Sequence, residues 1–244
     1  MNSSDAENRA TESRVEPSPA VPRPRALQRL WRAETVFVVA LGAFALLAIL
    51  ASLRPYFEWD LAISSRFNWR SFSPRGLLPA MGFLSTFGNG WTPYALTAMT
   101  ALAFLVFRRR SEAAGLVFSA GGSGFINTLF KLLIARPRPA PDLVPSYRDM
   151  ITQSFPSGHV TFYVCYFGFL FFVAYALLPK RSTIRRVTLI LLALPVLLIG
   201  FSRVYLGAHW PSDTVGAYLW SSVWLAISLR VYRRWKARRT FHRV

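Results

Sequence analysis

Long apolar runs, separated by short polar segments, dominate this chain of 244 residues. A run of roughly 20 apolar residues is long enough to cross the hydrocarbon of a bilayer as a helix, which satisfies its own backbone groups. Hydrophobic residues make up 53% of the chain and aromatic residues 15%. These features predict an all-α integral membrane protein. We place six transmembrane helices, packed as a bundle, at about residues 35–53, 91–107, 113–134, 159–178, 187–201 and 214–231.

Between spans one and two lies a stretch with a different pattern. Residues 56–69 mix aromatic with charged side chains, which is typical of a helix in the membrane interface. Residues 77–87 are apolar but short for a span, and Gly88-Asn89-Gly90 ends them. We therefore expect an additional interfacial helical segment here, followed by a packed or partly embedded helix. If residues 77–87 crossed the membrane, the orientation of every later span would be reversed.

The ends of the chain differ from its apolar middle. Residues 1–30 are rich in Ser, Pro, Ala, Arg and Glu, with too few large apolar side chains to offset the entropy lost on folding. They predict a disordered cytoplasmic tail rather than a cleaved signal peptide, because the leader is long and contains acidic residues and prolines. We assign residues 31–235 to the six-span membrane domain and residues 236–244 to a basic cytoplasmic tail.

The formal net charge of +18 suits either binding to nucleic acid or orientation in a membrane. Lys and Arg gather in the cytoplasmic loops of membrane proteins. With six spans, the segments on the side of the termini hold 20 of the 29 basic residues. The charge therefore predicts a multi-pass protein of a bacterial-type plasma membrane with both termini in the cytoplasm, and it requires no nucleic acid partner.

Polar residues collect in two connections, 131–159 and 203–213, which the span count places on the periplasmic or exterior face. Ionisable residues at membrane depth line a cavity or pair with each other. Lys131, Arg138 and Arg203 supply three cations, which suit the equatorial oxygens of a transferring phosphoryl group.

The segment before the fourth span suits the same chemistry. Ser157 is placed as an N-cap, Gly158 allows close approach of the backbone, and the free N–H groups of a helix N-terminus attract an anion. His159 would then stand beside a phosphate as a proton donor to the leaving oxygen. A plain cap and turn before a helix is the alternative for these residues.

His209 and Asp213 are four residues apart around a turn and a helix start. At this spacing the carboxylate can hold one ring nitrogen while the other attacks phosphorus. Considered alone, the pair is better explained as a structural hydrogen bond at a helix start than as a catalytic pair. The company of His159 and the three cations favours the chemical role.

Three motifs follow one another along the chain: Lys131 followed after six residues by Arg138-Pro139; Pro156-Ser157-Gly158-His159; and Ser202-Arg203, five residues, His209, three residues, Asp213. In this order they resemble the signatures of the type-2 phosphatidic acid phosphatase superfamily, which includes the vanadium haloperoxidases. The six-span frame resembles its integral-membrane lipid phosphatase branch.

The resemblance implies a role for each matching residue. His209 would form a phosphohistidine, Asp213 would orient it, and His159 would act as general acid and then as general base. The phosphoryl group would be bound by Lys131, Arg138, Ser157, Gly158 and Arg203. The resemblance implies neither a metal nor another cofactor, and the motifs contain too few carboxylates for a Mg²⁺ site.

The function that follows is hydrolysis of a phosphomonoester or diphosphate of a membrane lipid. Family resemblance suggests undecaprenyl diphosphate, phosphatidic acid, phosphatidylglycerol phosphate or a lipid A phosphate, and it favours undecaprenyl diphosphate or a broad lipid phosphatase. Two alternatives use the same site: transfer of the phosphoryl group to a lipid acceptor, and a non-enzymatic binder or transporter of lipid phosphates. The oligomeric state is not predicted.

Other residues receive more ordinary interpretations. Arg136 and Arg148 are predicted to be solvated or to face lipid headgroups, with an accessory phosphate role as the alternative. Cys165 is the single cysteine, so the chain has neither a disulfide framework nor a cysteine zinc site. The glycines of the third span are expected to let helices pack closely.

Overall fold

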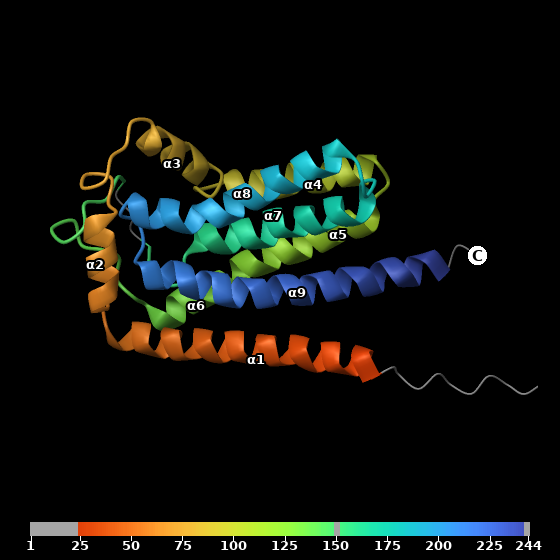
Figure 1. Cartoon of the computed structure of the whole chain (residues 1–244), viewed down its shortest axis with the longest axis horizontal. Helices are drawn as coiled ribbons and strands as arrows, with labels where there is room; N and C mark the ends of the chain where they lie inside the picture. Colours follow the sequence, from red (N-terminus) through yellow and green to blue (C-terminus); the bar gives the residue numbers. More distant parts are fainter. Residues whose placement is uncertain (1–23, 149–151, 242–244) are drawn as a thin grey trace, which may run out of the picture. The chain divides into compact units, whose positions relative to one another are not determined.

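The structure, a computed structural model, describes residues 24–148 and 152–241, and the side chains of residues 34–148 and 152–238. The regular secondary structure of the described residues is entirely helical, without a strand (Figure 1). The helices are α1 (Pro24–Leu53), α2 (Glu58–Arg66), α3 (Leu77–Thr86), α4 (Thr92–Val106), α5 (Arg110–Leu116), the π-helix η2 (Val117–Gly121), α6 (Gly122–Ile134), α7 (Gly158–Leu177), α8 (Thr183–Tyr205) and α9 (Pro211–Phe241). The all-α prediction is therefore confirmed for this part of the chain.

Four helical stretches within the described residues are long and apolar enough to cross a membrane: Glu34–Leu53, Arg110–Ile134, Gly158–Leu177 and Thr183–Tyr205. They coincide with predicted spans one, three, four and five. The predicted second span is the shorter apolar helix α4, of 15 residues, and the sixth lies inside the 31-residue helix α9. The predicted interfacial segment forms α2, and residues 77–87 form α3.

The chain divides into residues 1–38 and residues 39–244. Of the first unit, the structure describes the start of α1 from Pro24, so most of the predicted N-terminal tail lies outside the described residues. Helix α1 nevertheless begins before the boundary that we placed at residue 30. At the other end, α9 extends to Phe241, into the predicted C-terminal tail.

Small residues explain the packing of the long helix that α5, η2 and α6 form together. A Cβ atom added to Gly115 would lie 2.7 Å from Cζ of Phe169, and one added to Gly122 would lie 2.6 Å from Cζ2 of Trp224. Both distances are shorter than any carbon contact allows. These two glycines therefore let aromatic side chains of α7 and α9 lie against the helix backbone, as predicted for this span.

Helix α7 is the central element of the second unit and packs against α6, α8 and α9. Its residues Val160, Tyr163 and Phe169 are fully buried. In contrast, α4 and α8 expose large apolar side chains, including Met99 and Leu197, which are 68% and 73% exposed. Such exposure suits contact with lipid chains.

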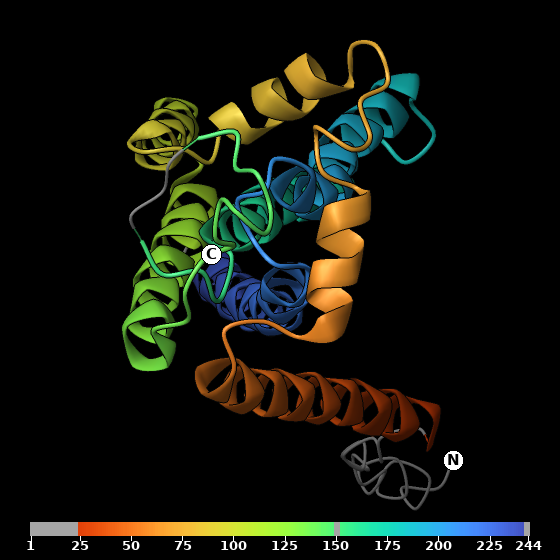
Figure 2. The same ribbon diagram turned by 90° about the vertical axis from the view of Figure 1, so that its left-hand side faces the viewer.

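Helix ends meet at one end of this bundle. Helices α6 and α8 end there, and α7 and α9 begin there (Figure 1). Figure 2 views the bundle from this end, where α2 lies against α9 and α3 against α8. Because each motif lies at one of these helix ends, the topology brings all three together.

Candidate functional site

Backbone hydrogen bonds tie the three motif segments to one another. The N–H of Ser154 donates to the carbonyl of Arg136 at 2.8 Å, and the N–H of Ser157 donates to the carbonyl of Asp213 at 3.2 Å. Earlier in the same loop, the N–H of Tyr147 donates to the carbonyl of Leu206 at 2.9 Å. The connection between α6 and α7 is therefore fixed against the turn between α8 and α9.

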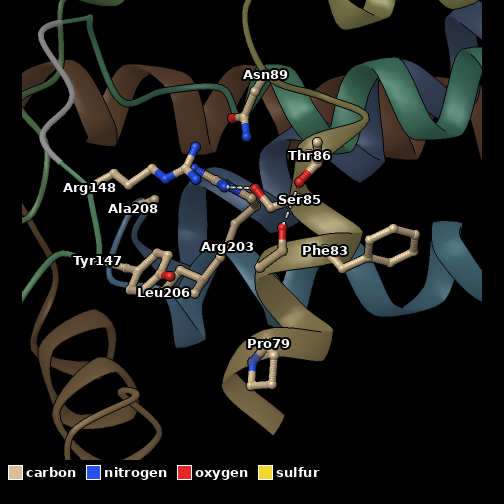
Figure 3. Close-up of a pocket in the computed structure, with 11 residues that line it drawn as sticks. Pro79, Phe83, Ser85, Thr86, Asn89, Tyr147, Arg148, Arg203, Leu206 and Ala208 are labelled. Carbon is tan, nitrogen blue, oxygen red and sulfur yellow. Dashed lines mark hydrogen bonds between the residues drawn. The ribbon is translucent and has the colours of Figure 1, made fainter. Parts of the chain in front are cut away.

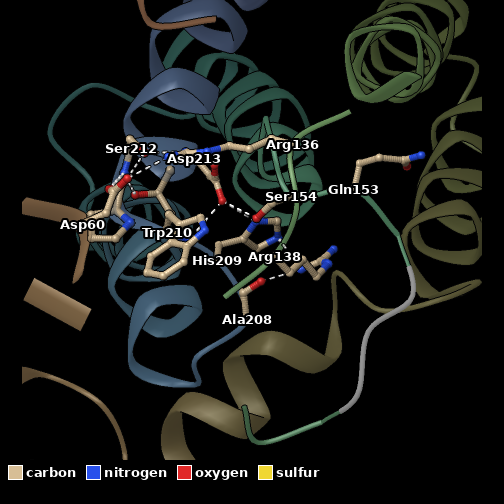
Figure 4. A network of polar contacts seen from close by, with 12 residues as sticks. Asp60, Arg136, Arg138, Gln153, Ser154, Ala208, His209, Trp210, Ser212 and Asp213 are labelled. Carbon is tan, nitrogen blue, oxygen red and sulfur yellow. Dashed lines mark hydrogen bonds and ion pairs between the residues drawn. The ribbon is translucent and has the colours of Figure 1, made fainter. Parts of the chain in front are cut away.

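His209 and Asp213 form the predicted pair, and both are buried (Figure 4). Nδ1 of His209 lies 3.3 Å from Oδ2 of Asp213. The same carboxylate oxygen accepts from the N–H of Trp210 at 2.9 Å and from the hydroxyl of Ser154. Because Trp210 directly precedes α9, Asp213 also caps that helix, which fixes the carboxylate in place.

The contact between His209 and Arg138 shows which ring nitrogen of His209 carries the proton. Nη1 of Arg138 lies 3.3 Å from Nε2 of His209, and a guanidinium can only donate. Nε2 must then be the hydrogen-bond acceptor. The ring proton is therefore on Nδ1, which donates a hydrogen bond to Asp213. This tautomer leaves a lone pair on Nε2, as attack on phosphorus requires.

The surroundings of His209 keep its ring neutral. Burial lowers the pKa of His209 well below its ordinary value, and the positive charges of Arg138, Lys131 and Arg203 lower it further. An uncharged imidazole is therefore the resting form near neutral pH.

Arg136 contradicts the prediction of a solvated or headgroup-facing side chain. It is 1% exposed, and its guanidinium donates to Asp213 at 2.7 Å, to the hydroxyl of Ser212 at 2.6 Å and to Asp60 at 2.8 Å (Figure 4). Its Nε donates to the carbonyl of Pro55 at 3.1 Å. Burial of this cation is offset by two carboxylates and two further acceptors. Asp60 is 76 residues away in sequence, so the motif alone could not reveal the pairing.

Asp60 brings the interfacial helix α2 to the site. Its Oδ1 accepts from the N–H of Ser212 at 2.8 Å, and its Oδ2 accepts from the hydroxyl of the same residue at 2.7 Å. Ser212 lies in the first turn of α9, whose N–H groups have no partner within the helix. Helix α2 therefore supports the helix start that carries Asp213.

The three predicted cations lie around the histidines with defined partners. Lys131 donates through Nζ to the carbonyls of Gln153 and Ser154. Arg138 donates to the carbonyls of Thr152 and Ala208, and Arg203 donates through Nη1 to the hydroxyl of Ser85 (Figure 3). These contacts aim the guanidinium and ammonium groups toward one end of the bundle.

The segment at the start of α7 is arranged largely as predicted. Ser157 occupies the N-cap position of α7 with an extended backbone, but its side chain makes no cap hydrogen bond. Its hydroxyl oxygen is buried and has no hydrogen-bond partner among the described residues. The hydroxyl is therefore available to an incoming oxygen. His159 is 7% exposed, and its Nε2 lies 2.9 Å from Oδ1 of Asn89.

A cavity of about 940 Å³ contains the predicted residues at one end. Lys131, Arg138, Gly158, His159 and His209 line that end. The remainder runs between α4 and the α5–η2–α6 helix, where it is lined mainly by small and apolar residues: Gly90, Pro93, Tyr94, Ala98, Val117, Ala120, Gly121, Gly124 and Phe162. A headgroup and an apolar chain therefore have adjoining space.

Arg203 does not line this cavity. It lines a smaller pocket of about 240 Å³ on the side of α3, together with Ser85, Asn89 and Tyr147 (Figure 3). Asn89 and Arg148 line both spaces, so the two spaces adjoin. Of the eight predicted site residues, five line the large cavity and Arg203 lines the smaller pocket. Ser157 and Asp213 line neither space; Ser157 directly precedes Gly158, and Asp213 contacts His209.

Among the side chains that the structure describes, those of residues 34–148 and 152–238, no group of three or more His, Cys, Asp or Glu is arranged to hold a metal ion.

The motifs did not predict five residues that the structure places at the site: Asp60, Ser85, Asn89, Arg136 and Ser154. Arg136 and Ser154 stand next to motif residues, and their proximity was the available signal. Asp60 comes from the segment predicted to be interfacial, Ser85 from the predicted packed or partly embedded helix, and Asn89 from the turn predicted to end that helix. A polar side chain in or next to an apolar run was the signal at Ser85 and Asn89.

Comparison with known proteins places this site in a family context. The model of a family described as the PAP2 superfamily matches residues 112–237, which hold all three motifs. Phosphatidylglycerophosphatase B of Bacillus subtilis is 29% identical over 46% of this chain, which matches just over half (54%) of that protein. Decaprenylphosphoryl-5-phosphoribose phosphatase of Mycobacterium tuberculosis is 37% identical, over 61% of this chain and 77% of the relative.

A solved structure shares the fold. The transmembrane PAP2-type phosphatidylglycerolphosphate phosphatase from Bacillus subtilis superposes with a TM-score of 0.69 at 21% identity, over 81% of this chain and 96% of that one. This similarity extends beyond the motif region to most of the helices.

Proposed function

This chain belongs to the PAP2 superfamily, and from that membership and the geometry of the site we propose that it is a membrane lipid phosphatase. It releases phosphate from a phosphomonoester or diphosphate of a lipid, without a metal. One observation carries the proposal: Nε2 of His209 bears a lone pair beside Arg138, while Nδ1 is held by Asp213, at the headgroup end of a cavity that continues between helices.

In the first step, the lone pair on Nε2 of His209 attacks phosphorus as the bond to the lipid oxygen breaks. His159, in its protonated form, gives a proton to that oxygen, so the lipid leaves as an alcohol or as a lipid monophosphate. The imidazole that now carries the phosphoryl group is cationic, and Asp213 stabilises it through the Nδ1 proton.

In the second step, water attacks the phosphohistidine. His159 accepts a proton from the water, the N–P bond breaks, and its electron pair returns to Nε2. Inorganic phosphate leaves and both histidines regain their starting states.

The phosphoryl oxygens need donors throughout both steps. Lys131 and Arg138 line the same end of the cavity as His209, and Arg203 lies at its boundary. The buried hydroxyl of Ser157 and the N-terminus of α7 at Gly158 supply neutral donors. Such donors stabilise the charge of the transition state.

The lipid chain occupies the apolar part of the cavity. That part lies between α4 and η2, whose neighbouring faces expose apolar side chains. The chain can therefore remain in the bilayer while its headgroup reaches His209. Helix α2 is held in place beside the site, because Asp60 binds Arg136 and Ser212.

The bundle crosses the membrane six times, with α4 and α9 added to the four long apolar helices. A helix of 31 residues spans about 46 Å, which exceeds the roughly 30 Å of bilayer hydrocarbon. In this topology both termini are cytoplasmic and the site faces the periplasm or exterior, in agreement with the placement of Lys and Arg.

The substrate belongs to the lipid phosphates with long apolar chains. Relatives are named for a phosphatidylglycerophosphate and for a decaprenyl-linked phosphoribose phosphate, which have in common a phosphomonoester and a lipid anchor. Undecaprenyl diphosphate, phosphatidic acid, phosphatidylglycerol phosphate and lipid A phosphates form the panel to be tested.

The test is release of inorganic phosphate from that panel by purified protein in proteoliposomes. Wild type should release phosphate from at least one lipid, and His209→Ala should release none. Substantial turnover by the alanine variant would exclude His209 as the nucleophile. Phosphorylated acceptor lipid without inorganic phosphate would instead establish the phosphotransferase alternative, and binding without either product would establish a lipid-phosphate binder.

A further inference from the structure

The last turn of α3 and the loop that follows it contribute polar contacts to His159 from outside the three motifs. Oδ1 of Asn89 lies 2.9 Å from Nε2 of His159, a separation at which the ring N–H donates to the amide oxygen. The hydroxyl oxygen of Ser85 lies 3.4 Å from the same nitrogen. Both residues come from a segment about 70 residues before His159 in the chain, so only the fold brings them together.

Gly88, between these two residues, makes room for the ring. A Cβ atom added to Gly88 would lie 2.4 Å from Cδ2 and 2.8 Å from Cγ of His159. Gly88 is not among the glycines with positive φ, which are Gly76, Gly90 and Gly207. The requirement for glycine is therefore steric: the ring of His159 rests on the backbone of this turn.

Ser85 connects the ring to a phosphate-binding cation. Its hydroxyl accepts a hydrogen bond from Nη1 of Arg203, since the guanidinium can only donate (Figure 3). The side chain of Ser85 is 4% exposed and so lies within the wall of the site. The same hydroxyl therefore fixes the distance between Arg203 and His159.

We propose that Ser85, Gly88 and Asn89 form a fourth segment of the active site, which positions His159 for proton transfer to the leaving oxygen. The inference rests on the proposed phosphatase function and deepens it. The amide oxygen of Asn89 accepts a hydrogen bond from the ring N–H of His159, and the backbone of Gly88 packs against the face of the ring. Ser85 contacts both the ring and Arg203. The three residues act through His159 and are positioning residues rather than proton carriers.

The leaving group distinguishes this role from simple structural support. A lipid alkoxide is a poor leaving group and needs the proton of His159, whereas the 4-nitrophenolate of 4-nitrophenyl phosphate leaves without one. Asn89→Leu and Gly88→Ala should lower kcat/KM for a lipid phosphate by about 10²-fold, the lower end of what general acid catalysis contributes. Both variants should keep kcat/KM for 4-nitrophenyl phosphate close to the wild-type value, because that ratio covers the formation of the phosphohistidine and not its later hydrolysis by water, in which His159 acts again.

Two further comparisons connect the effect to His159. The double variant Asn89→Leu/His159→Ala should be no slower on the lipid than His159→Ala alone, because a residue that acts through His159 has nothing left to position. Asn89→Asp keeps an oxygen acceptor and should retain most of the lipid activity. Gly42→Ala is the control for adding a methyl group, since that Cβ atom meets nothing within 4 Å.

The outcomes separate this inference from the proposed function. Equal losses of kcat/KM on both substrates, no loss of kcat/KM on the lipid, or additive losses in the double variant would overturn the positioning role while the phosphatase activity stands. If the wild type hydrolyses neither substrate, the proposed function fails and this inference fails with it. Thermal unfolding in detergent identifies any variant whose loss comes from unfolding.

Discussion

Nη1 of Arg136 lies 2.7 Å from Oδ1 of Asp213, and neither side chain is exposed to solvent. The second carboxylate oxygen of Asp213 faces His209, so Arg136 neutralises the group that orients the predicted nucleophile. Asp60 holds the other side of the guanidinium at 2.8 Å. The interfacial helix α2 and the start of α9 are therefore joined through one buried cation.

Replacement of Arg136 should harm both the fold and turnover. Arg136→Gln leaves two buried carboxylates without a counter-charge, a change that costs about 3–5 kcal/mol of stability. Arg136→Lys keeps the charge but cannot reach both carboxylates, so it should fold and have a reduced kcat. Thermal unfolding in detergent and phosphate release measure the two effects. The exposed Arg75→Gln is the control, and a glutamine variant that matches it in both assays would show the ion pair to be dispensable.

Asp213→Asn should reduce turnover far more than it reduces stability. An asparagine of equal size can present its amide group to Nδ1 of His209, which would move the ring proton to Nε2 and remove the attacking lone pair. The corresponding change in serine protease triads costs about 10⁴-fold, and we expect a loss of that order in kcat. The exposed Asp142→Asn should be unaffected. Wild-type kcat in Asp213→Asn would mean that the carboxylate does not set the tautomer.

The sequence predicted those parts of the fold and site that depend on local pattern. Apolar runs located the long helices, and the motif spacing located His159 and His209, because both signals lie within a few neighbouring residues. Arg136 was misread because its partner Asp60 lies on another helix, and a motif contains no information on such a pair. A buried arginine and a solvated one look alike in sequence.

The segment that contacts His159 was not predicted for the same reason. Gly88 and Asn89 appeared only as a helix-ending turn, since the ring that rests on them lies far along the chain. The helices at the predicted second and sixth spans show another limit. A short helix such as α4 and a long, partly charged one such as α9 depart from the simple relation between apolar length and bilayer thickness.

The acid limb of the pH profile should lie below pH 6.5. His209 must be neutral to attack, and its pKa is lowered by burial and by nearby cations. Activity is therefore retained as the pH falls through the ordinary histidine range and is lost only at the lowered pKa. In Arg138→Gln one cation is removed, so the pKa of His209 rises and the limb moves to higher pH. Both enzymes are compared by kcat/KM on the same lipid phosphate, so the titration of the substrate is common to the two profiles. An unmoved limb would assign the titration to another group.

Vanadate should inhibit and chelators should not. Vanadate adopts the five-coordinate geometry of a transferring phosphoryl group and would meet Lys131, Arg138 and Arg203 in place of substrate. Cations in the protein supply the charge that a metal supplies elsewhere. Phosphate release is measured with vanadate, and separately after treatment with EDTA. A loss of activity in EDTA that divalent ions restore would contradict the metal-independent mechanism.

The orientation of the site can be tested with one engineered thiol on each side of the membrane. Cys165, the single native cysteine, is buried, so background labelling should be low. Tyr147→Cys, beside Arg148 and 43% exposed at that position, should react with an impermeant maleimide added to intact cells. Lys180→Cys, in the connection between α7 and α8, should react only after the cells are opened. The opposite pattern would mean that an even number of spans precedes the site, as it would if α3 were a fourth crossing helix before it. Labelling of both from outside would exclude α7 as a span.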